Sequence, residues 1–323
     1  MSRFDFRRLN ARHPYLLALL LLALALAVNY LLQPNLFQSR VLNSNMRTFL
    51  PLMILAAGQT IVIITGGIDL SVGAIVSLAA AVLVTNLSPD AAAGQIALIV
   101  LAAAGVGMAA GALNGFCVAF LRLQPIVTTY ATSFIFSGLA LWILPRPGGS
   151  MPQQLARTYR SAAPLGLPLG IYIAILLIIG WTFLRSTRFG TYLVAVGGRP
   201  DAAYASGVPV TWVRFASYVL AGLLAAFSAL ALTLLTSSGD PRMGDAMTLD
   251  SIVAVVLGGT RLSGGQGGVA GSIIGVAILG LIRNIISFAN VPTWWQTLVD
   301  ALIIITALAA PGLVRLLRSR RQA

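Results

Sequence analysis

An acidic residue, Asp69, stands in a short break between two apolar runs and is the first candidate for chemistry in this sequence. The octapeptide around it contains Gly66, Gly67, Ser71 and Gly73. Paired glycines break a helix and allow close backbone approach, and an acid at membrane depth is rare unless it is functional or paired. Ser71 can cap a following helix. The pattern indicates either a functional hinge or a tight helix–helix turn.

Other kinds of chemistry find little support in the residue types. The chain has one histidine, one cysteine and no lysine or glutamate, so it offers neither a metal-ligand cluster nor a nucleophile–base pair. Leu262-Ser263-Gly264-Gly265-Gln266 spells the signature loop of ABC ATPases. An ATPase also needs a phosphate loop that ends in Gly-Lys-Ser/Thr, which a chain without lysine does not have. The sequence predicts a protein that is not an enzyme and holds no cofactor.

The composition places these residues in a membrane protein. Of 323 residues, 58% are hydrophobic and 9% are charged, whereas a soluble domain carries about 25% charged residues. Much of the surface must therefore face lipid, and we expect residues 1–323 to form a single transmembrane domain. A bilayer core takes about 20 apolar residues per helix. The sequence predicts an all-α, polytopic fold of about ten transmembrane helices with short loops.

The apolar runs that support this fold are separated by short polar segments. They lie at residues 15–32, 49–65, 71–87, 95–121, 126–144, 169–184, 215–236, 251–259, 268–287 and 295–313. The run 251–259 is too short to cross a bilayer as a regular helix. Either the glycine-rich segment that follows completes the span, or the run remains a broken or half helix, which is tolerated only when it is buried in protein.

The charges predict the orientation. All 21 cations are arginine and all eight acids are aspartate, with a net charge of +13. The arginines lie at the ends of apolar runs rather than on a soluble basic face, which argues against nucleic-acid binding. A cytoplasmic N-terminus puts most of them on the cytoplasmic side, so we expect both termini inside. Residues 185–214 then form the longest cytoplasmic loop.

The segment 66–73 resembles the hallmark of the ribose-type, carbohydrate-uptake family of bacterial ABC permeases. Three further blocks follow in that family's order. They are Gly111, Asn114 and Gly115 with residues 125–128, then residues 197–203 with 206–208, and then residues 255–260 with Gly264, Gly265 and Gly271. One departure is Arg199, where the family usually has asparagine.

The resemblance implies the membrane-spanning permease subunit of an ATP-driven importer for a monosaccharide, in the bacterial inner membrane. It further implies a second permease subunit, two ABC ATPase subunits that hold ATP and Mg²⁺, and an extracytoplasmic sugar-binding protein. Two rivals stay open at this point: an ion-coupled secondary transporter, and an ABC permease for amino acids or nucleosides. Which sugar is carried is not encoded in these motifs.

The loop 185–214 has its own physical interpretation. Pro200 suits a first helical turn, Asp201 complements a helix N-terminus and Gly207 suits a stop, so a short helix is expected at 200–206. The resemblance implies that this helix presses into a groove on the ATPase; the alternative is a solvated loop on the membrane surface. The residues assigned to the coupling loop are Gly197, Gly198, Pro200, Asp201, Ala202, Ala203, Ser206 and Gly207.

A possible internal repeat relates two glycine turns. Residues 66–73 align with 258–265, a separation of 258 − 66 = 192, and both copies lie between apolar runs. Equivalent hinge turns and chance are both open in a chain with 32 glycines. The second turn adds Gly258, Gly259 and Arg261 to the hinge residues. We expect Asp69 to cap the backbone amides of Ser71 or Val72, to pair with Arg261 and to make no contact with sugar.

Two amides within apolar runs are candidates for the transport pathway. Gln59 and Asn114 could bind sugar hydroxyls, and hydrogen bonds between helices are the alternative.

Overall fold

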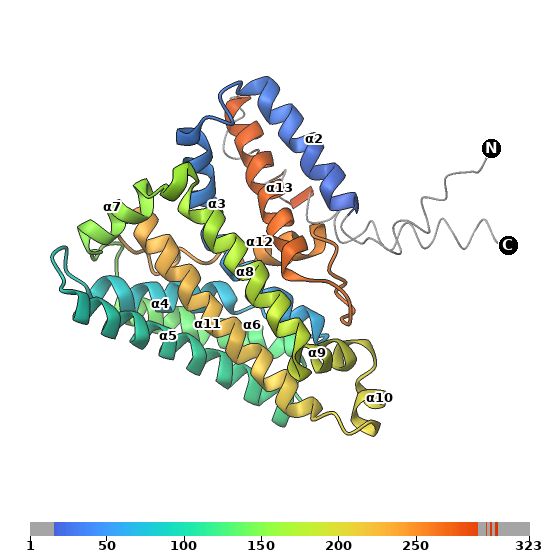
Figure 1. The fold of residues 1–323 in the computed structure, drawn as a ribbon. Helices are drawn as coiled ribbons and strands as arrows, with labels where there is room; N and C mark the ends of the chain where they lie inside the picture. Colours follow the sequence, from blue (N-terminus) through green and yellow to red (C-terminus); the bar gives the residue numbers. More distant parts are fainter. Residues whose placement is uncertain (1–15, 290–294, 296–297, 299–300, 303–323) are drawn as a thin grey trace, which may run out of the picture.

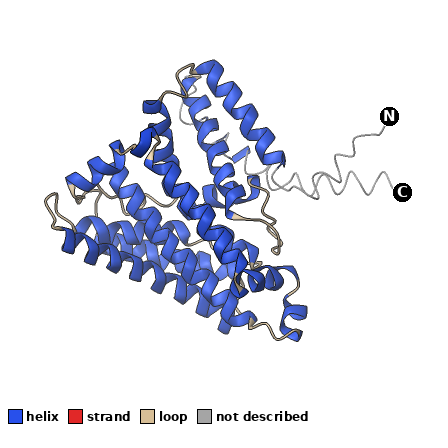
Figure 2. Cartoon of the chain, in the orientation of Figure 1, coloured by secondary structure: helices blue, strands red, loops and turns tan. Residues whose placement is uncertain are grey.

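The computed structural model describes residues 16–289, 295, 298, 301 and 302, and the regular elements of these residues are helices (Figure 2). The all-α prediction is therefore confirmed over the described part of the chain. The elements are α2 (Leu16–Leu32), α3 (Ser39–Ile64), α4 (Val72–Asn86), α5 (Ala93–Gly115), the π-helical turn η1 (Phe116–Phe120), α6 (Pro125–Ile143), α7 (Gln153–Ser161), the 3₁₀ turn η2 (Pro164–Gly166), α8 (Leu169–Ser186), α9 (Arg188–Gly198), α10 (Pro200–Ala205), α11 (Val210–Thr236), α12 (Met247–Leu257) and α13 (Val269–Phe288).

Helix α3 is the centre of the fold. Residues 49–64 are all buried, and 83% of the apolar window of α3 is inside the protein, against 11% for α8. A helix that is apolar on every side is stable only where neighbours cover every side. Helix α11 packs along α3, α4 and α5, while α13 packs on α2, α3 and α12, so α3 joins the two groups (Figure 1).

A proline inside α3 is compensated by side chains from other helices. Pro51 has no N–H, so the carbonyl of Arg47, four residues earlier, loses its helical partner. The hydroxyl of Tyr159 in α7 donates to that carbonyl at 3.1 Å. The Ser228 hydroxyl in α11 donates to the carbonyl of Pro51 itself at 2.7 Å. The Tyr159 bond satisfies the backbone carbonyl that the proline leaves without a helical partner, and the two bonds together fix α7 and α11 to α3.

The count of spans differs from the prediction. Six of the described helices are long and apolar enough to cross a membrane: α3, α5 with its continuation to Ala119, α6, α8, α11 and α13. Helices α2, α4 and α12 are shorter, and the run 295–313 lies almost wholly outside the described residues. The 11 residues of α12 extend about 17 Å at 1.5 Å per residue. Ten spans are therefore not confirmed, while the half-helix alternative is present as α12.

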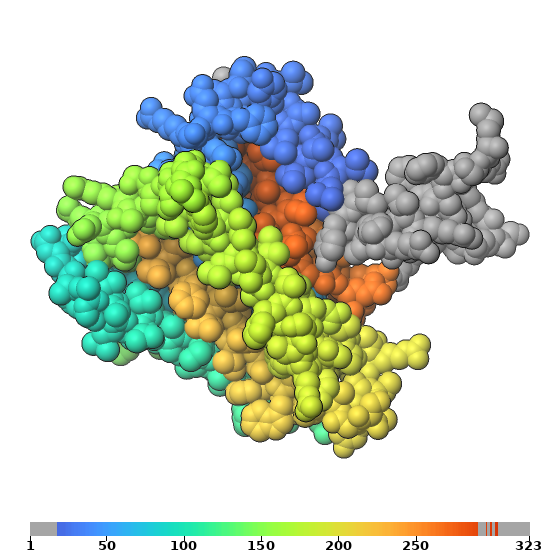
Figure 3. All heavy atoms as spheres, viewed as in Figure 1, coloured from blue at the N-terminus to red at the C-terminus, as the bar shows by residue number. Residues whose placement is uncertain are grey.

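The space-filling view shows that the helices of the described region form a continuous body with α9 and α10 at one end (Figure 3). This end matters for function because the turn after α3, the loop before α13 and the start of α11 meet there.

Candidate functional site

A helix stop at Gly66 positions the acidic motif. Gly66 has φ +83°, and its N–H donates to the Ile63 carbonyl at 2.9 Å. The Gly67 N–H donates to the Val62 carbonyl at 3.2 Å. These two bonds define a Schellman motif, which needs a left-handed residue where glycine has no Cβ to clash. The turn ends α3 and sends the chain back into the protein towards α4.

Asp69 lies at the start of α4 and is completely buried. Its Oδ1 accepts the Ser71 backbone N–H at 2.8 Å and the Ser71 hydroxyl at 2.7 Å. The expected bond to the Ser71 amide is therefore present. Asn114 of α5 donates from Nδ2 to the Ser71 hydroxyl at 2.6 Å and to Asp69 Oδ2 at 3.5 Å. The carboxylate is thus met by hydrogen bonds from two elements.

Helix α6 completes this buried network. The Thr132 hydroxyl donates to Asn114 Oδ1 at 2.6 Å, and the Thr129 hydroxyl accepts the Leu70 N–H at 2.9 Å. Both threonines are buried. Sequence reasoning missed them, although their three-residue spacing places them on one face of a helix. The network joins α4, α5 and α6 through side chains.

The two amides proposed for the pathway are hydrogen-bonded to protein groups. Gln59 donates from Nε2 to the Asp69 carbonyl at 3.2 Å, and its Oε1 is buried without a partner among the described residues. Asn114 uses both ends of its amide on Ser71, Asp69 and Thr132. Both side chains are fully buried. This is the helix–helix alternative, and a role in a sugar pathway stays a prediction.

Gly73 lies where two short helices meet. The Gly73 N–H donates to the Thr248 hydroxyl at 3.0 Å, and the Gly244 N–H donates to the Ser77 hydroxyl at 3.0 Å. The backbones of Gly73 and Gly244 are too close for a side chain on either residue. The neighbour that packs closely at Gly73 is the segment that leads into α12.

The second glycine turn has the same geometry as the first, one residue out of the expected register. Gly259 has φ +87° and donates to the Val256 carbonyl at 2.9 Å, while the Thr260 N–H donates to the Val255 carbonyl at 3.1 Å. This is again a Schellman motif. The turn is defined by its left-handed residue and not by the match of residue types. Gly66 therefore corresponds to Gly259, a separation of 259 − 66 = 193. Gly258 precedes that residue and packs against α13.

The expected ion pair between Asp69 and Arg261 is wrong. Asp69 is completely buried, whereas Arg261 is exposed, and the two described side chains form no ion pair. Arg261 instead uses its backbone N–H to close its own loop onto the Gln266 carbonyl at 3.1 Å. The alignment of the two glycine turns did not show the direction of the chain after each turn. After the first turn the chain leads Asp69 into the protein, whereas after the second it leads Arg261 to the surface.

Three separate glycine motifs converge in one contact, which we call the glycine junction and define as Gly66, Gly197, Gly264 and Gly265. The Gly265 N–H donates to the carbonyl of Ile64, the last residue of α3, at 2.9 Å. A Cβ built on Gly197 would lie 2.6 Å from the Gly265 nitrogen, and one on Gly264 would lie 2.9 Å from the Gly66 nitrogen. Backbone therefore touches backbone with no room for side chains.

The segment 185–214 is helical rather than an open loop. Helix α9 contributes Gly197 to the glycine junction, and the short helix expected at 200–206 is present as α10 (Pro200–Ala205). Gly207 has φ +82° and donates to the Tyr204 carbonyl at 2.9 Å, which ends α10 as expected.

The coupling-loop residues differ in exposure. Ala203, which was assigned to the coupling loop, is buried against apolar residues of this chain, so its side chain does not lie on the exposed surface of α10. The exposed positions of α10 and its C-terminal end are Asp201, Ala202, Tyr204, Ala205, Ser206 and Gly207.

The sequence of this chain is similar to known permeases. The family model for the permease component of branched-chain amino acid transport systems matches residues 41–308. The ribose import permease of Escherichia coli K12 is 34% identical over 295 residues, which cover 90% of this chain and 91% of that one. The Bacillus subtilis 168 ribose import permease is 36% identical over 265 residues, 79% of each chain. A galactose/methyl galactoside import permease of Haemophilus influenzae is 32% identical over 327 residues, 96% of each. No solved structure matches the chain.

The family match, the relatives and the apolar helices thus support a multi-pass permease of the inner membrane. The chain belongs to this ABC permease family, and its ribose-type resemblance is confirmed.

Proposed function

We propose that this chain is the membrane-spanning subunit of an ATP-driven importer for a monosaccharide. The relatives whose names state a substrate carry ribose, galactose or fructose. A second permease subunit would complete the pathway, two ABC ATPase subunits with ATP and Mg²⁺ would drive it, and an extracytoplasmic binding protein would deliver the sugar. Both termini would lie in the cytoplasm.

The observation that carries the mechanism is the glycine junction. It places α9 directly against Ile64, the last residue of α3, and α10 begins after one intervening residue. Contacts between backbones are stiff because no flexible side chain lies between them. A displacement of α10 by an ATPase would therefore reach the turn at Gly66, and the Asp69–Asn114–Thr132 hydrogen bonds would pass it to α4, α5 and α6.

A direct test uses the exposed position Ser206 at the end of α10. Ser206→Trp should abolish ATP-dependent uptake of labelled ribose or galactose while the chain still inserts in the membrane. Ser88→Trp, at an exposed serine between α4 and α5, is the matched control and should transport normally. Uptake that persists in the Ser206 variant would remove α10 from the docking surface. Uptake that stops with ionophores but survives ATP depletion would favour an ion-coupled transporter instead.

A second candidate is an importer of branched-chain amino acids, favoured by the description of the matching family model. Labelled leucine in the same assay separates the two. Uptake of leucine and not of sugars would replace the monosaccharide proposal and leave the coupling argument intact.

A further inference from the structure

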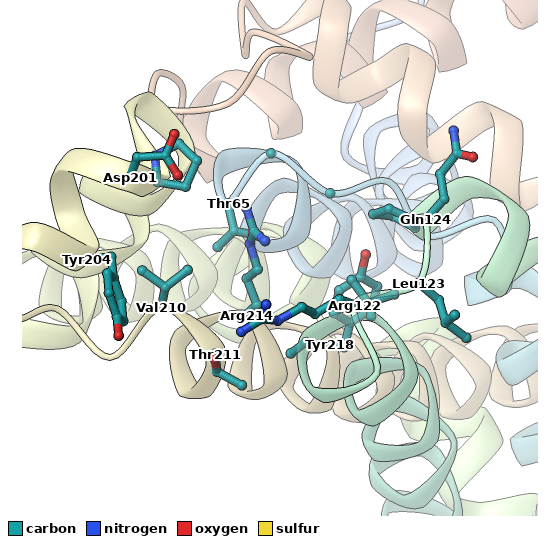
Figure 4. A pocket seen from close by; sticks show the side chains of 16 residues that line it. Thr65, Arg122, Leu123, Gln124, Asp201, Tyr204, Val210, Thr211, Arg214 and Tyr218 are labelled. Carbon is teal, nitrogen blue, oxygen red and sulfur yellow. The ribbon is translucent and has the colours of Figure 1, made fainter.

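A pocket of about 630 Å³ lies between α10 and the ends of the spanning helices. Its walls come from the Gly66–Gly67 turn, η1 and the segment after it, α10 and the first three turns of α11. Figure 4 shows Arg122 and Arg214 in the middle of this space, with Asp201 and Tyr204 of α10 on one side and Gln124 on the other. The pocket is distinct from the buried Asp69 network, which it does not include.

The guanidinium groups of Arg122 and Arg214 have no bonded partner among the described residues, neither in an ion pair nor in a hydrogen bond. Asp201 is the single acidic residue that lines the pocket, so the side chains carry a net charge of 2 − 1 = +1. Two cations that one acid does not neutralise repel each other, and an anion between them relieves that repulsion.

The backbone conformation at Arg122 is unusual. Helix α5 ends in the π-helical turn η1, and Arg122 follows with φ +57°, in the left-handed region that a residue with a Cβ adopts at a cost. Single π turns occur often at functional sites. Glycine would relieve the strain here, so an arginine at this position is consistent with a need for its side chain in the pocket.

A third group points to a ligand. The Tyr218 side chain of α11 is 1% exposed and lines the pocket, and its hydroxyl has no hydrogen-bond partner among the described residues. It lies beside Gly67, where a built Cβ would come within 2.7 Å of the hydroxyl oxygen. A buried hydroxyl without a partner costs about 1–3 kcal/mol, a cost that an acceptor bound in the pocket would remove.

We propose that this pocket binds a phosphate ester. The phosphate lies between Arg122 and Arg214, because guanidinium groups match phosphate oxygens with paired, charge-assisted hydrogen bonds. Tyr218 is the third donor. The side chains of Asp201 and Gln124 can then form hydrogen bonds with hydroxyl groups of the esterified alcohol. Two sources share this chemistry: a soluble polyol phosphate, and the headgroup of an anionic phospholipid such as phosphatidylglycerol. The proposed binding of a phosphate ester does not depend on which substrate the permease transports. Its access from the cytoplasm follows from the proposed orientation of the chain.

The probe for the test is glycerol 3-phosphate, with uncharged glycerol as the control ligand. The full chain is placed in nanodiscs of phosphatidylcholine alone, and binding is measured by isothermal titration calorimetry. We expect binding of glycerol 3-phosphate and not of glycerol, with an affinity that falls as sodium chloride is raised. Arg214→Gln should weaken binding about tenfold or more. Arg188→Gln, an exposed arginine outside the pocket, should bind as the unaltered chain does.

Two further variants separate a ligand role from a structural role. Arg122→Gly relieves a left-handed residue, and Tyr218→Phe removes a buried unpartnered hydroxyl, so both should keep or raise the thermal unfolding temperature. Both should nevertheless weaken binding. A fall in stability with unchanged binding would show that these residues serve the fold.

Nanodiscs of equal parts phosphatidylcholine and phosphatidylglycerol identify the source. If the lipid fills the pocket, these mixed nanodiscs suppress the binding of glycerol 3-phosphate. Native mass spectrometry then finds phosphatidylglycerol retained by the unaltered chain but not by the Arg214→Gln variant. If binding of the soluble ester is unchanged, the ligand is soluble. The proposal is overturned if neither ester nor lipid binds, or if the Arg122 and Arg214 variants bind as the unaltered chain does.

Discussion

The glycine junction can be tested with one methyl group. Gly197 is buried in the last turn of α9, and an added Cβ would meet only backbone atoms, including the Gly265 nitrogen at 2.6 Å. Backbone cannot rotate away as a side chain can, so Gly197→Ala must move α9 from α3 and break the bond between the Gly265 N–H and the Ile64 carbonyl. The neighbouring Gly198 has nothing within 4 Å of its built Cβ and provides the control.

The magnitude follows from three terms. Overpacking costs about 1–3 kcal/mol, and the lost hydrogen bond costs about 1 kcal/mol. Alanine in place of glycine in a helix returns about 1 kcal/mol. Gly197→Ala should therefore lose about 1–3 kcal/mol in net stability, whereas Gly198→Ala should be neutral or slightly more stable.

Thermal unfolding of the purified variants, followed by size-exclusion chromatography, should place Gly197→Ala several degrees below Gly198→Ala. Uptake assays with the partner ATPase should show a larger loss for Gly197→Ala than its folded fraction explains. Equal unfolding temperatures for the two variants would refute the close contact between backbones, and with it the route from α10 to α3.

The remaining predictions concern the other end of α3, the buried acid and the topology. Tyr159→Phe should lower stability by about 1–3 kcal/mol, because the Arg47 carbonyl loses its donor; burial raises the pKa of Tyr159, so the effect should not change with pH in the physiological range. Asp69→Asn keeps a side-chain acceptor for the Ser71 N–H, so its thermal unfolding temperature should be well above that of Asp69→Ala. The reverse order would contradict the role of Asp69 as a cap for the Ser71 amide. With the native cysteine removed, cysteine at Arg188 should react with an impermeant thiol reagent only from inside, and cysteine at Arg157 only from outside.

Local signals predicted the elements well. The helix at 200–205 followed from Pro200 and Gly207, because proline and glycine act on the backbone conformation of their own position. The hydrogen bond from the Ser71 amide to Asp69 followed in the same way, since the two residues are neighbours in the chain. In such cases the responsible atoms lie within a few residues, and no knowledge of the packing is needed.

Hydrogen-bond partners from distant segments of the chain could not be predicted from the sequence. Nothing in the order of residues shows that Asn114 reaches Asp69, or that Thr132 reaches Asn114. The pairing of Asp69 with Arg261 failed because an alignment of similar letters carries no information about which way each chain leaves its turn. The number of spans is not confirmed for a related reason: hydropathy alone does not separate a lipid-crossing helix from a shorter one that protein covers, such as α4.

The polar groups of this chain fall into two kinds, and the difference decides where ligands should be sought. Asp69 is buried, yet its oxygens accept hydrogen bonds from Ser71 and Asn114. A satisfied buried group of this kind holds a structure together, and exposing it to a substrate would first require breaking those bonds. Arg122 and Arg214 are the opposite case, because they reach an open pocket and have no partner in the described protein. A ligand gains more free energy from groups that need partners than from groups that already have them. The acid in the most conspicuous motif therefore belongs to the scaffold, and the arginines near α10 are the better place to look for a bound molecule.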